Sequence, residues 1–141
     1  MTGVYVLALA LLLALGFGLY RKAVDGRVRV LDGHPSGLDA GRLGEELGAS
    51  ATFLQFSAPV CAPCRATRRV LGDLTADSPG VAHIEIDAQQ RPDLVDELGI
   101  TRTPTVLLLD GGGRVRGRIV GAPTRPDALR ALDSLLDGKR S

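Results

Sequence analysis

The sequence predicts one α/β domain, with a mixed sheet covered by helices on both faces, behind a single apolar helix. Three observations support this prediction. Strand-like and helix-like segments alternate after residue 23, an order that implies crossover connections and parallel strand pairing. A glycine-rich turn at residues 110–113 adds an antiparallel pair. An uncharged apolar stretch at residues 4–20 precedes them, so we divide the chain into an anchor, residues 1–22, and a domain, residues 23–141.

Composition narrows the class of protein. The chain has 141 residues, of which 45% are hydrophobic and 23% charged, as expected for a globular domain with an added apolar segment. A net charge of +1, without a basic stripe interleaved with aromatic residues, argues against a nucleic-acid partner. The two cysteines are too few for a scaffold built on disulfide bonds.

Residues 4–20 are predicted to span a lipid bilayer. As a helix they would measure roughly 25 Å, close to the thickness of the hydrocarbon core. Tyr5 and Tyr20 lie near the two ends, and Arg21 and Lys22 end the run. A cleaved signal peptide would want a basic segment before Val4 and a small-residue cleavage site after the run, and a buried core helix would leave no polar face for water. A retained anchor fits better than either alternative.

Basic residues beside the span predict its orientation. They all lie on its C-terminal side, at positions 21, 22, 27 and 29. The positive-inside rule then places the domain in the cytoplasm and the N-terminus outside. An extracytoplasmic domain is the alternative, because the rule has exceptions.

The first half of the domain is predicted to contain two strands and two helices. Alternation of apolar and polar residues indicates the strands, and Gly48 is a suitable residue past a helix end. The elements are a half-exposed strand at 28–32, a turn at 34–37, a weak helix at 39–47, a strand at 52–56 and a helix starting near residue 61 and running past residue 74.

The second half alternates in the same way. The run at 105–109 is continuously apolar, which is typical of a strand buried on both faces, whereas the alternation at 115–120 is consistent with an edge strand. The elements are a strand at 81–86, a helix at 92–98 followed by Gly99, a strand at 105–109, the turn at 110–113, a strand at 115–120 and an amphipathic helix at 126–136.

Both cysteines lie in the run SAPVCAPCR, which follows a predicted strand and opens a predicted helix. The N–H groups and the positive dipole end of a helix N-terminus stabilise a thiolate, and Cys61 gains most from them. Cys64 lies one turn further in and is expected to be more buried. We therefore predict that Cys61 attacks a substrate disulfide and that Cys64 resolves the mixed disulfide, with Pro63 stiffening the loop.

Two other interpretations of the cysteine pair are weaker. A zinc site needs two more ligands, and His34 and His83 do not form a second close-spaced pair. Inert buried thiols are expected within an apolar run, not between a proline-containing turn and three arginines. We expect no metal, and no cofactor beyond a redox-active Cys61–Cys64 disulfide.

The chain closely resembles the thioredoxin family, and the resemblance covers about residues 27 to 138. Three landmarks match in order: FSAPVCAPCR, the Thr-Pro pair in GITRTPTVLLLDGGGRV, and the glycine of RIVGA. The resemblance implies the thioredoxin fold. It also implies a cis Pro104 that faces the dithiol, with backbone groups of Thr103 pairing with a substrate strand and Gly121 flanking the substrate groove. Val60, Ala62 and Pro63 would contact substrate beside the cysteines.

The sequence departs from the family pattern beside the dithiol. The family usually has Trp where this chain has Val60, and Gly-Pro where it has Ala-Pro. A buried acidic residue commonly precedes the first cysteine by six positions, where this chain has Gln55, and its frequent lysine partner aligns with His83. Proton transfer to and from Cys64 must then use water, with His83 as a candidate relay because histidine titrates near neutrality.

The expected function is reduction of protein disulfides at a membrane. The partners would be disulfide-containing protein substrates, an upstream thiol or membrane electron donor, and the lipid bilayer through residues 4–20. Two alternatives stay open. One is an extracytoplasmic thiol reductase of the kind used in cytochrome c maturation or envelope redox repair, and the other is a non-catalytic interaction module whose thiols are incidental.

Overall fold

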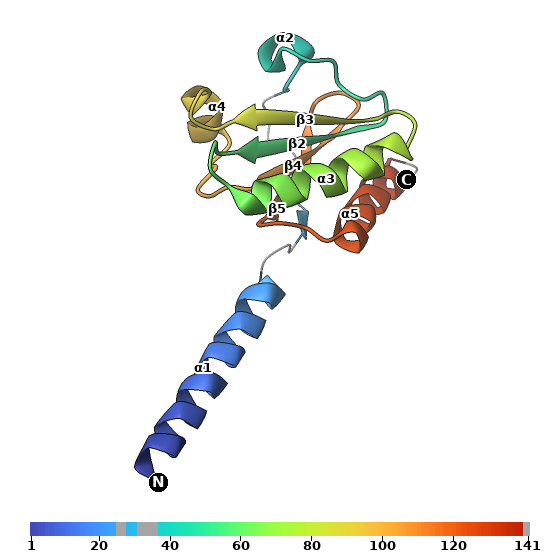
Figure 1. Ribbon diagram of the computed structural model, residues 1–141. Helices are drawn as coiled ribbons and strands as arrows, with labels where there is room; N and C mark the ends of the chain where they lie inside the picture. Colours follow the sequence, from blue (N-terminus) through green and yellow to red (C-terminus); the bar gives the residue numbers. More distant parts are fainter. Residues whose placement is uncertain (25–27, 31–36, 140–141) are drawn as a thin grey trace.

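The computed structural model describes residues 1–24, 28–30 and 37–139, and Figure 1 shows the path of the chain. The order of strands and helices agrees with the predicted order. Residues 31–36, which hold the end of the first predicted strand and most of the predicted turn, lie outside the described residues. The elements are α1 (Thr2–Val24), β1 (Val28–Val30), α2 (Ala40–Leu43), β2 (Ala51–Ser57), α3 (Ala62–Ala76), β3 (Val81–Asp87), α4 (Pro92–Glu97), β4 (Thr105–Asp110), β5 (Val115–Val120) and α5 (Arg125–Gly138).

A five-stranded mixed sheet in the order β1-β5-β4-β2-β3 forms the middle of three layers. Helices α3 and α5 cover one face, where Leu71, Leu74 and Leu132 pack with Phe53 of β2. Helix α4 covers the other face, where Leu94 lies in a second apolar cluster. The predicted fold class, a mixed sheet with helices on both faces, is therefore confirmed.

Parallel pairing is rarer in this sheet than the alternating order of elements predicted. Among the described strands, only β2 and β3 are parallel, and the other three pairs are antiparallel. The reason lies in the segment 88–104. This segment begins where β3 ends and carries only the short α4, so it stays at one end of the sheet. The next strand, β4, must then run back beside β2.

The prediction that residues 115–120 form an edge strand is wrong. Strand β5 lies between β1 and β4, and β1 and β3 are the edges of the sheet. Its side chains nevertheless alternate, because Val115 and Ile119 are buried in the core whereas Arg116 points to solvent. Alternation reports that one face of a strand is covered by apolar neighbours, and it carries no information on whether the strand has two partners.

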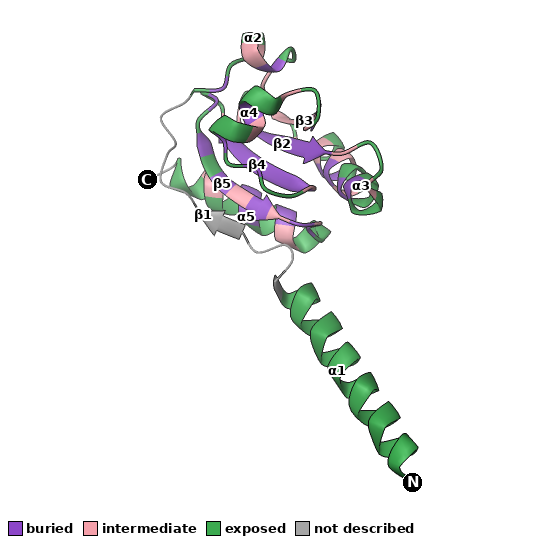
Figure 2. Cartoon of the chain, turned by 90° about the vertical axis from the view of Figure 1, so that its left-hand side faces the viewer, coloured by how far each residue is buried: buried purple, intermediate pink, exposed green. Residues whose placement is uncertain are grey.

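Strand β2 is buried along its whole length. Its neighbours β3 and β4 complete the sheet on both sides, and helices cover both faces (Figure 2). Polar side chains in this strand must therefore find partners inside the protein. Thr52 accepts a hydrogen bond from the Gly48 N–H at 2.9 Å, and Gln55 has three partners described below.

The helix predicted at 39–47 is shorter than expected, since α2 has four residues. Asp39 caps its N-terminus, and Gly44 ends it with a left-handed backbone at φ 77°. Gly48, expected to follow the helix, has a different role. A side chain there would meet the Ala51 carbonyl oxygen at 2.1 Å, so glycine allows the chain to pass close to the start of β2.

The apolar helix predicted at the N-terminus is present as α1. Among the described residues, Thr2–Ala23 is the one helix long and apolar enough to cross a membrane, by length and composition. Residues 2–23 of this helix are exposed, and Figures 1 and 2 show α1 projecting from the α/β domain.

Candidate active site

Three loops meet at one end of the sheet. Strand β2 leads into the loop before Cys61, and the register pairs Phe56 of β2 with Thr105 of β4 and Thr105 with Val120 of β5. The residues that precede β4 and follow β5 therefore lie at the same edge as this loop. We call this edge the dithiol end, and the opposite edge, formed by the β4–β5 hairpin at 110–114, the hairpin end.

The two cysteines form a disulfide at the N-terminus of α3. The Sγ atoms are 2.03 Å apart and the Cα atoms 5.2 Å apart. Cys61 is the N-cap of the helix, and its Sγ accepts a hydrogen bond from the Cys64 N–H at 3.2 Å. Pro63 lies in the first helical turn, where no donor is needed, and its carbonyl accepts from the Thr67 hydroxyl at 2.9 Å. The predicted strand-to-helix context of the motif is confirmed.

Exposure differs sharply between the two cysteines. Cys64 is 1% exposed, whereas Cys61 is partly exposed. Val60 is 96% exposed, and Ala62 and Pro63 are also exposed. A substrate can therefore reach Cys61 directly, with three small apolar residues forming the rim around it.

Gln55 holds the dithiol loop from below. Its buried amide nitrogen donates to the Cys64 carbonyl oxygen at 2.9 Å and to the Ser57 hydroxyl oxygen at 2.9 Å. Its amide oxygen accepts from His83 Nε2 at 3.0 Å. Because an amide oxygen only accepts, the proton on the His83 ring sits on Nε2. Position 55 thus joins β2, β3 and α3 through one satisfied polar side chain.

Hydrogen bonds connect His83 of β3 to Cys64, but this hydrogen-bonded path does not reach the Cys64 sulfur. The path runs through the Gln55 amide to the Cys64 backbone oxygen. Burial lowers the pKa of His83, against a smaller opposing effect of Glu85, so the ring is neutral at pH 7. The structure gives His83 the role of donor to Gln55, and its role as a proton relay stays a prediction.

An ion pair lies beside the site, on the exposed side of α3. Arg68 donates two hydrogen bonds to the Glu85 carboxylate, which lower the pKa of that carboxyl from its ordinary value. Arg65 and Arg69, the other arginines after the motif, are exposed. A hollow of about 280 Å³ adjoins the pair and is lined by Ser57, Ala58, Pro59, Arg68, Glu85 and Asp87.

Pro104 and Gly121, both singled out from the sequence, are in contact. The Thr103–Pro104 peptide bond is cis, as the resemblance implied, and Pro104 is buried. Its carbonyl oxygen accepts from the Gly121 N–H at 2.9 Å, and Gly121 has φ 88°. Thr103 is partly exposed at the same edge. The sheet register brings these residues to the dithiol end, while their contact with substrate stays a prediction.

Sequence reasoning missed three hydroxyl side chains that hold the site. Ser57 accepts from Gln55, Thr67 ties α3 to the Pro63 carbonyl, and the Thr105 hydroxyl donates to the Arg102 carbonyl oxygen at 2.6 Å. All three hydroxyl residues are buried. Thr67 gave a signal in the sequence, because it is a polar residue four positions after Pro63 on the inner side of a helix.

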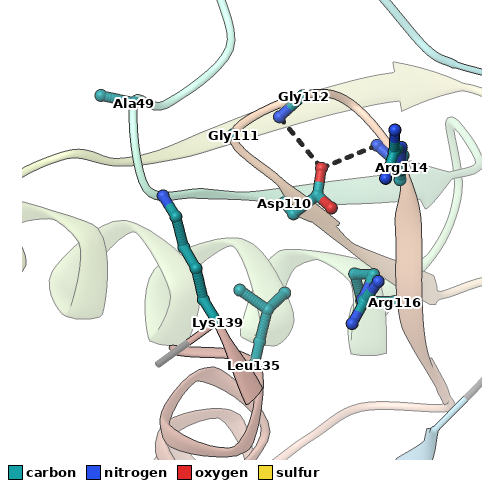
Figure 3. Close-up of a pocket in the computed structure, with 8 residues that line it drawn as sticks. All are labelled: Ala49, Asp110, Gly111, Gly112, Arg114, Arg116, Leu135 and Lys139. Atoms are coloured by element: carbon teal, nitrogen blue, oxygen red, sulfur yellow. Dashed lines mark hydrogen bonds between the residues drawn. The ribbon is translucent and has the colours of Figure 1, made fainter. Parts of the chain in front are cut away.

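A second hollow, about 540 Å³ in volume and larger than the one beside the Arg68–Glu85 pair, lies at the hairpin end. Figure 3 shows that it is lined from the β4–β5 hairpin and α5, with Asp110 accepting from the N–H groups of Gly112 and Arg114. Its lining residues are Ala49, Asp110, Gly111, Gly112, Arg114, Arg116, Leu135 and Lys139. Within the described part of the chain, no group of three or more His, Cys, Asp or Glu side chains is placed to hold a metal ion.

The family model described as Thioredoxin matches residues 45–133, well over half of the chain. The chain belongs to the thioredoxin family. Curated thioredoxins are also similar to it. A putative thioredoxin H10 of Arabidopsis thaliana is 34% identical over 71 residues, which cover 50% of this chain and 46% of that protein. A thioredoxin of Synechocystis is 29% identical over 85 residues, which cover 60% of this chain and 78% of that protein.

The chain spans about half the length of the first curated thioredoxins that it matches. Solved thioredoxins agree with the fold. The thioredoxin NaTrxh of Nicotiana alata superimposes with a TM-score of 0.54 at 28% identity, covering 61% of this chain and 73% of that one. Mitochondrial thioredoxin 3 of Saccharomyces cerevisiae, in its oxidized form, gives a TM-score of 0.54 at 26% identity, covering 60% and 78%. Residues 1–44, including α1, lie outside the family match.

Proposed function

We propose that this thioredoxin-family chain is a thiol–disulfide oxidoreductase that reduces protein disulfides at a membrane. The observation that carries the proposal is the asymmetry of the dithiol. Cys61 is accessible at the N-terminus of α3, with a helix N–H directed at its sulfur, and Cys64 is buried behind it. The first arrangement suits an attacking thiolate and the second suits a resolving thiol.

The reaction transfers two electrons. The Cys61 thiolate attacks one sulfur of the substrate disulfide, so a Cys61–substrate bond forms and the other substrate sulfur leaves as a thiolate. Cys64, after losing its proton to water, attacks Cys61 Sγ. The Cys61–Cys64 disulfide forms, and the second substrate thiolate leaves. Both substrate thiolates take protons from solvent, and an upstream thiol or membrane electron donor then reduces the disulfide.

Insulin reduction in the presence of dithiothreitol tests the activity. The wild-type chain in detergent should precipitate insulin far faster than Cys61→Ser, because only the wild type has an accessible attacking thiol. Cys64→Ser should accumulate a mixed disulfide through Cys61, visible on a non-reducing gel. Equal rates for wild type and Cys61→Ser would leave the thiols incidental. A mixed disulfide trapped by Cys61→Ser, and not by Cys64→Ser, would reverse the roles of the two cysteines.

The membrane tether is α1, and the domain is proposed to face the cytoplasm. The exposed apolar surface of α1 and the basic residues that follow it support this placement, because an uncovered helix of this kind needs lipid and the positive-inside rule orients it. A C-terminal alkaline phosphatase fusion should be inactive and a fluorescent-protein fusion bright. An active phosphatase would place the domain outside and make the donor an envelope component.

A further inference from the structure

Strand β1 determines at which end of the sheet the chain enters the domain from α1. This strand is antiparallel to β5, and its register pairs Val28 with Ile119 and Val30 with Gly117. Strand β5 runs from the hairpin end toward the dithiol end, because Val120 pairs with Thr105 at the start of β4. Strand β1 therefore begins at the dithiol end, and α1 is joined to the domain there.

A row of paired residues measures how far this attachment point lies from the cysteines. Val28 pairs with Ile119, Ile119 with Val106, and Val106 with Gln55. Neighbouring strands lie about 4.8 Å apart, so Val28 and Gln55 are separated by roughly 14 Å. The Gln55 amide in turn donates to the Cys64 carbonyl oxygen. The first residue of β1 thus lies in the same transverse row as the residue that supports the dithiol.

The connection between α1 and β1 is short. Helix α1 ends at Val24 and β1 begins at Val28, so three residues, 25–27, join them. Even when fully extended, this stretch holds Val24 and Val28 within about 14 Å of each other. The opposite end is much further away, because the seven residues of β2 alone span about 20 Å along the sheet. Leu135 of the C-terminal helix and Lys139, the residue that follows this helix, line the hollow at that far end (Figure 3).

We propose that the dithiol end faces the membrane and that the substrates are disulfides held at the bilayer surface, because Gln55 lies within roughly 30 Å of Val24 at the end of α1. This inference rests on the proposed function, both the exchange chemistry and the tether. A short tether converts an encounter with a partner on the same surface into a nearly intramolecular one, and it prevents the dithiol from turning far into bulk solvent. The substrate class is therefore a disulfide in a membrane protein or membrane-bound peptide, rather than in a freely diffusing protein.

Lipid nanodiscs that carry the full chain test this geometry with a defined probe. The probe is a cyclic disulfide peptide coupled to a phospholipid headgroup through a short or a long polyethylene glycol spacer. The matched control is an anchor-swapped chain, in which residues 1–24 are moved behind Ser141 with a linker of equal length. This change ties the hairpin end, and not the dithiol end, to the bilayer.

The wild type should reduce the short-spacer probe at least tenfold faster than the anchor-swapped chain, while both should reduce the long-spacer probe at similar rates. A second variant, with about 20 Gly/Ser residues inserted between Val24 and Val28, should also lose several-fold on the short-spacer probe, because a flexible linker lowers the local concentration of the dithiol. If the anchor-swapped chain does not fold, the comparison of the wild type with the insertion variant tests the membrane-facing geometry.

Insulin reduction in detergent separates two kinds of failure. All folded variants should reduce insulin equally, since the dithiol is unchanged. Should none of them reduce it, the proposed function is wrong and this inference with it. Should insulin be reduced while the short-spacer probe is reduced at one rate by wild type, swapped and extended chains, the exchange function stands and the membrane-facing geometry is wrong.

Discussion

The hairpin end and the dithiol end of the sheet differ in two features, the volume of the hollow and the presence of the reactive cysteines. The hairpin end has the larger hollow, about 540 Å³, lined by Arg114, Arg116 and Lys139 but by no cysteine or histidine. The dithiol end has a hollow of about 280 Å³, lined by Ser57, Ala58 and Pro59, which precede Cys61, and by Arg68, Glu85 and Asp87. For thiol exchange an accessible sulfur with a buried partner matters more than a deep pocket, because the proposed substrate is itself a protein surface.

The two ends also differ in how they are held together. At the hairpin end, Asp110 accepts from two backbone N–H groups of its own turn, so the contacts are local and partly exposed. At the dithiol end, Gln55 joins three elements from a fully buried position. The two Asp110 side-chain hydrogen bonds stay within its own turn, whereas the Gln55 hydrogen bonds couple the stability of the core to the position of Cys64.

Replacing Gln55 or Asp110 with alanine should affect the stability and the activity of the domain to different extents. Gln55→Ala should destabilise the domain by about 2–4 kcal/mol, since it opens a cavity and leaves buried polar partners unsatisfied. It should also lower the insulin reduction rate several-fold. Asp110→Ala should cost about 1 kcal/mol and leave the rate unchanged. Urea unfolding followed by circular dichroism, with the insulin assay on the same samples, measures both quantities. A Gln55→Ala chain as stable and as active as Asp110→Ala would mean that the buried amide does not couple fold and site.

The sequence was sufficient for the features that depend on local structure. The strand-to-helix position of the cysteines followed from the local sequence, because a predicted strand precedes SAPVCAPCR and Pro63 suits the first turn of a helix. The apolar run at 105–109 predicted a strand buried on both faces, and β4 is buried from Thr105 to Leu109. These features need no knowledge of what packs against them.

Features that depend on tertiary pairing were not predictable in the same way. Nothing in the residues 28–30 says that β1 adds to β5, so β5 was mistaken for an edge strand. By alternation alone Gln55 is the polar half of a strand, and only the family resemblance put it at a buried position; all seven residues of β2 are buried. Gly48 looked like a helix end, and it is instead a close approach between backbones. For β5 and Gln55 the deciding contacts come from segments distant in the sequence, and a side chain at Gly48 would meet the distant Gly80 and Ala82 as well as the nearby Ala51.

The smallest expected difference between the two ends is a pH dependence of stability, because the titration of His83 affects only the dithiol end. Burial lowers the pKa of His83 in the folded protein, so the unfolded chain takes up a proton there at higher pH than the folded one. The free energy of unfolding should therefore decrease as pH falls from the ordinary histidine pKa toward the lowered one. Above the ordinary pKa, His83 should add no pH dependence to stability. Glu85 also has a lowered pKa, but its contribution is lost at lower pH, below the ordinary carboxyl range.

His83→Gln should keep a donor to the Gln55 oxygen and remove this titration. Unfolding of both chains in detergent between about pH 5 and pH 7 should give a shallower pH dependence for His83→Gln, with the two chains differing most at the acidic end. Because an amide lies between His83 and Cys64, the insulin reduction rate should keep the same pH profile in both chains. A profile that loses a step near neutrality in His83→Gln would instead make His83 a proton relay, through water rather than through Gln55.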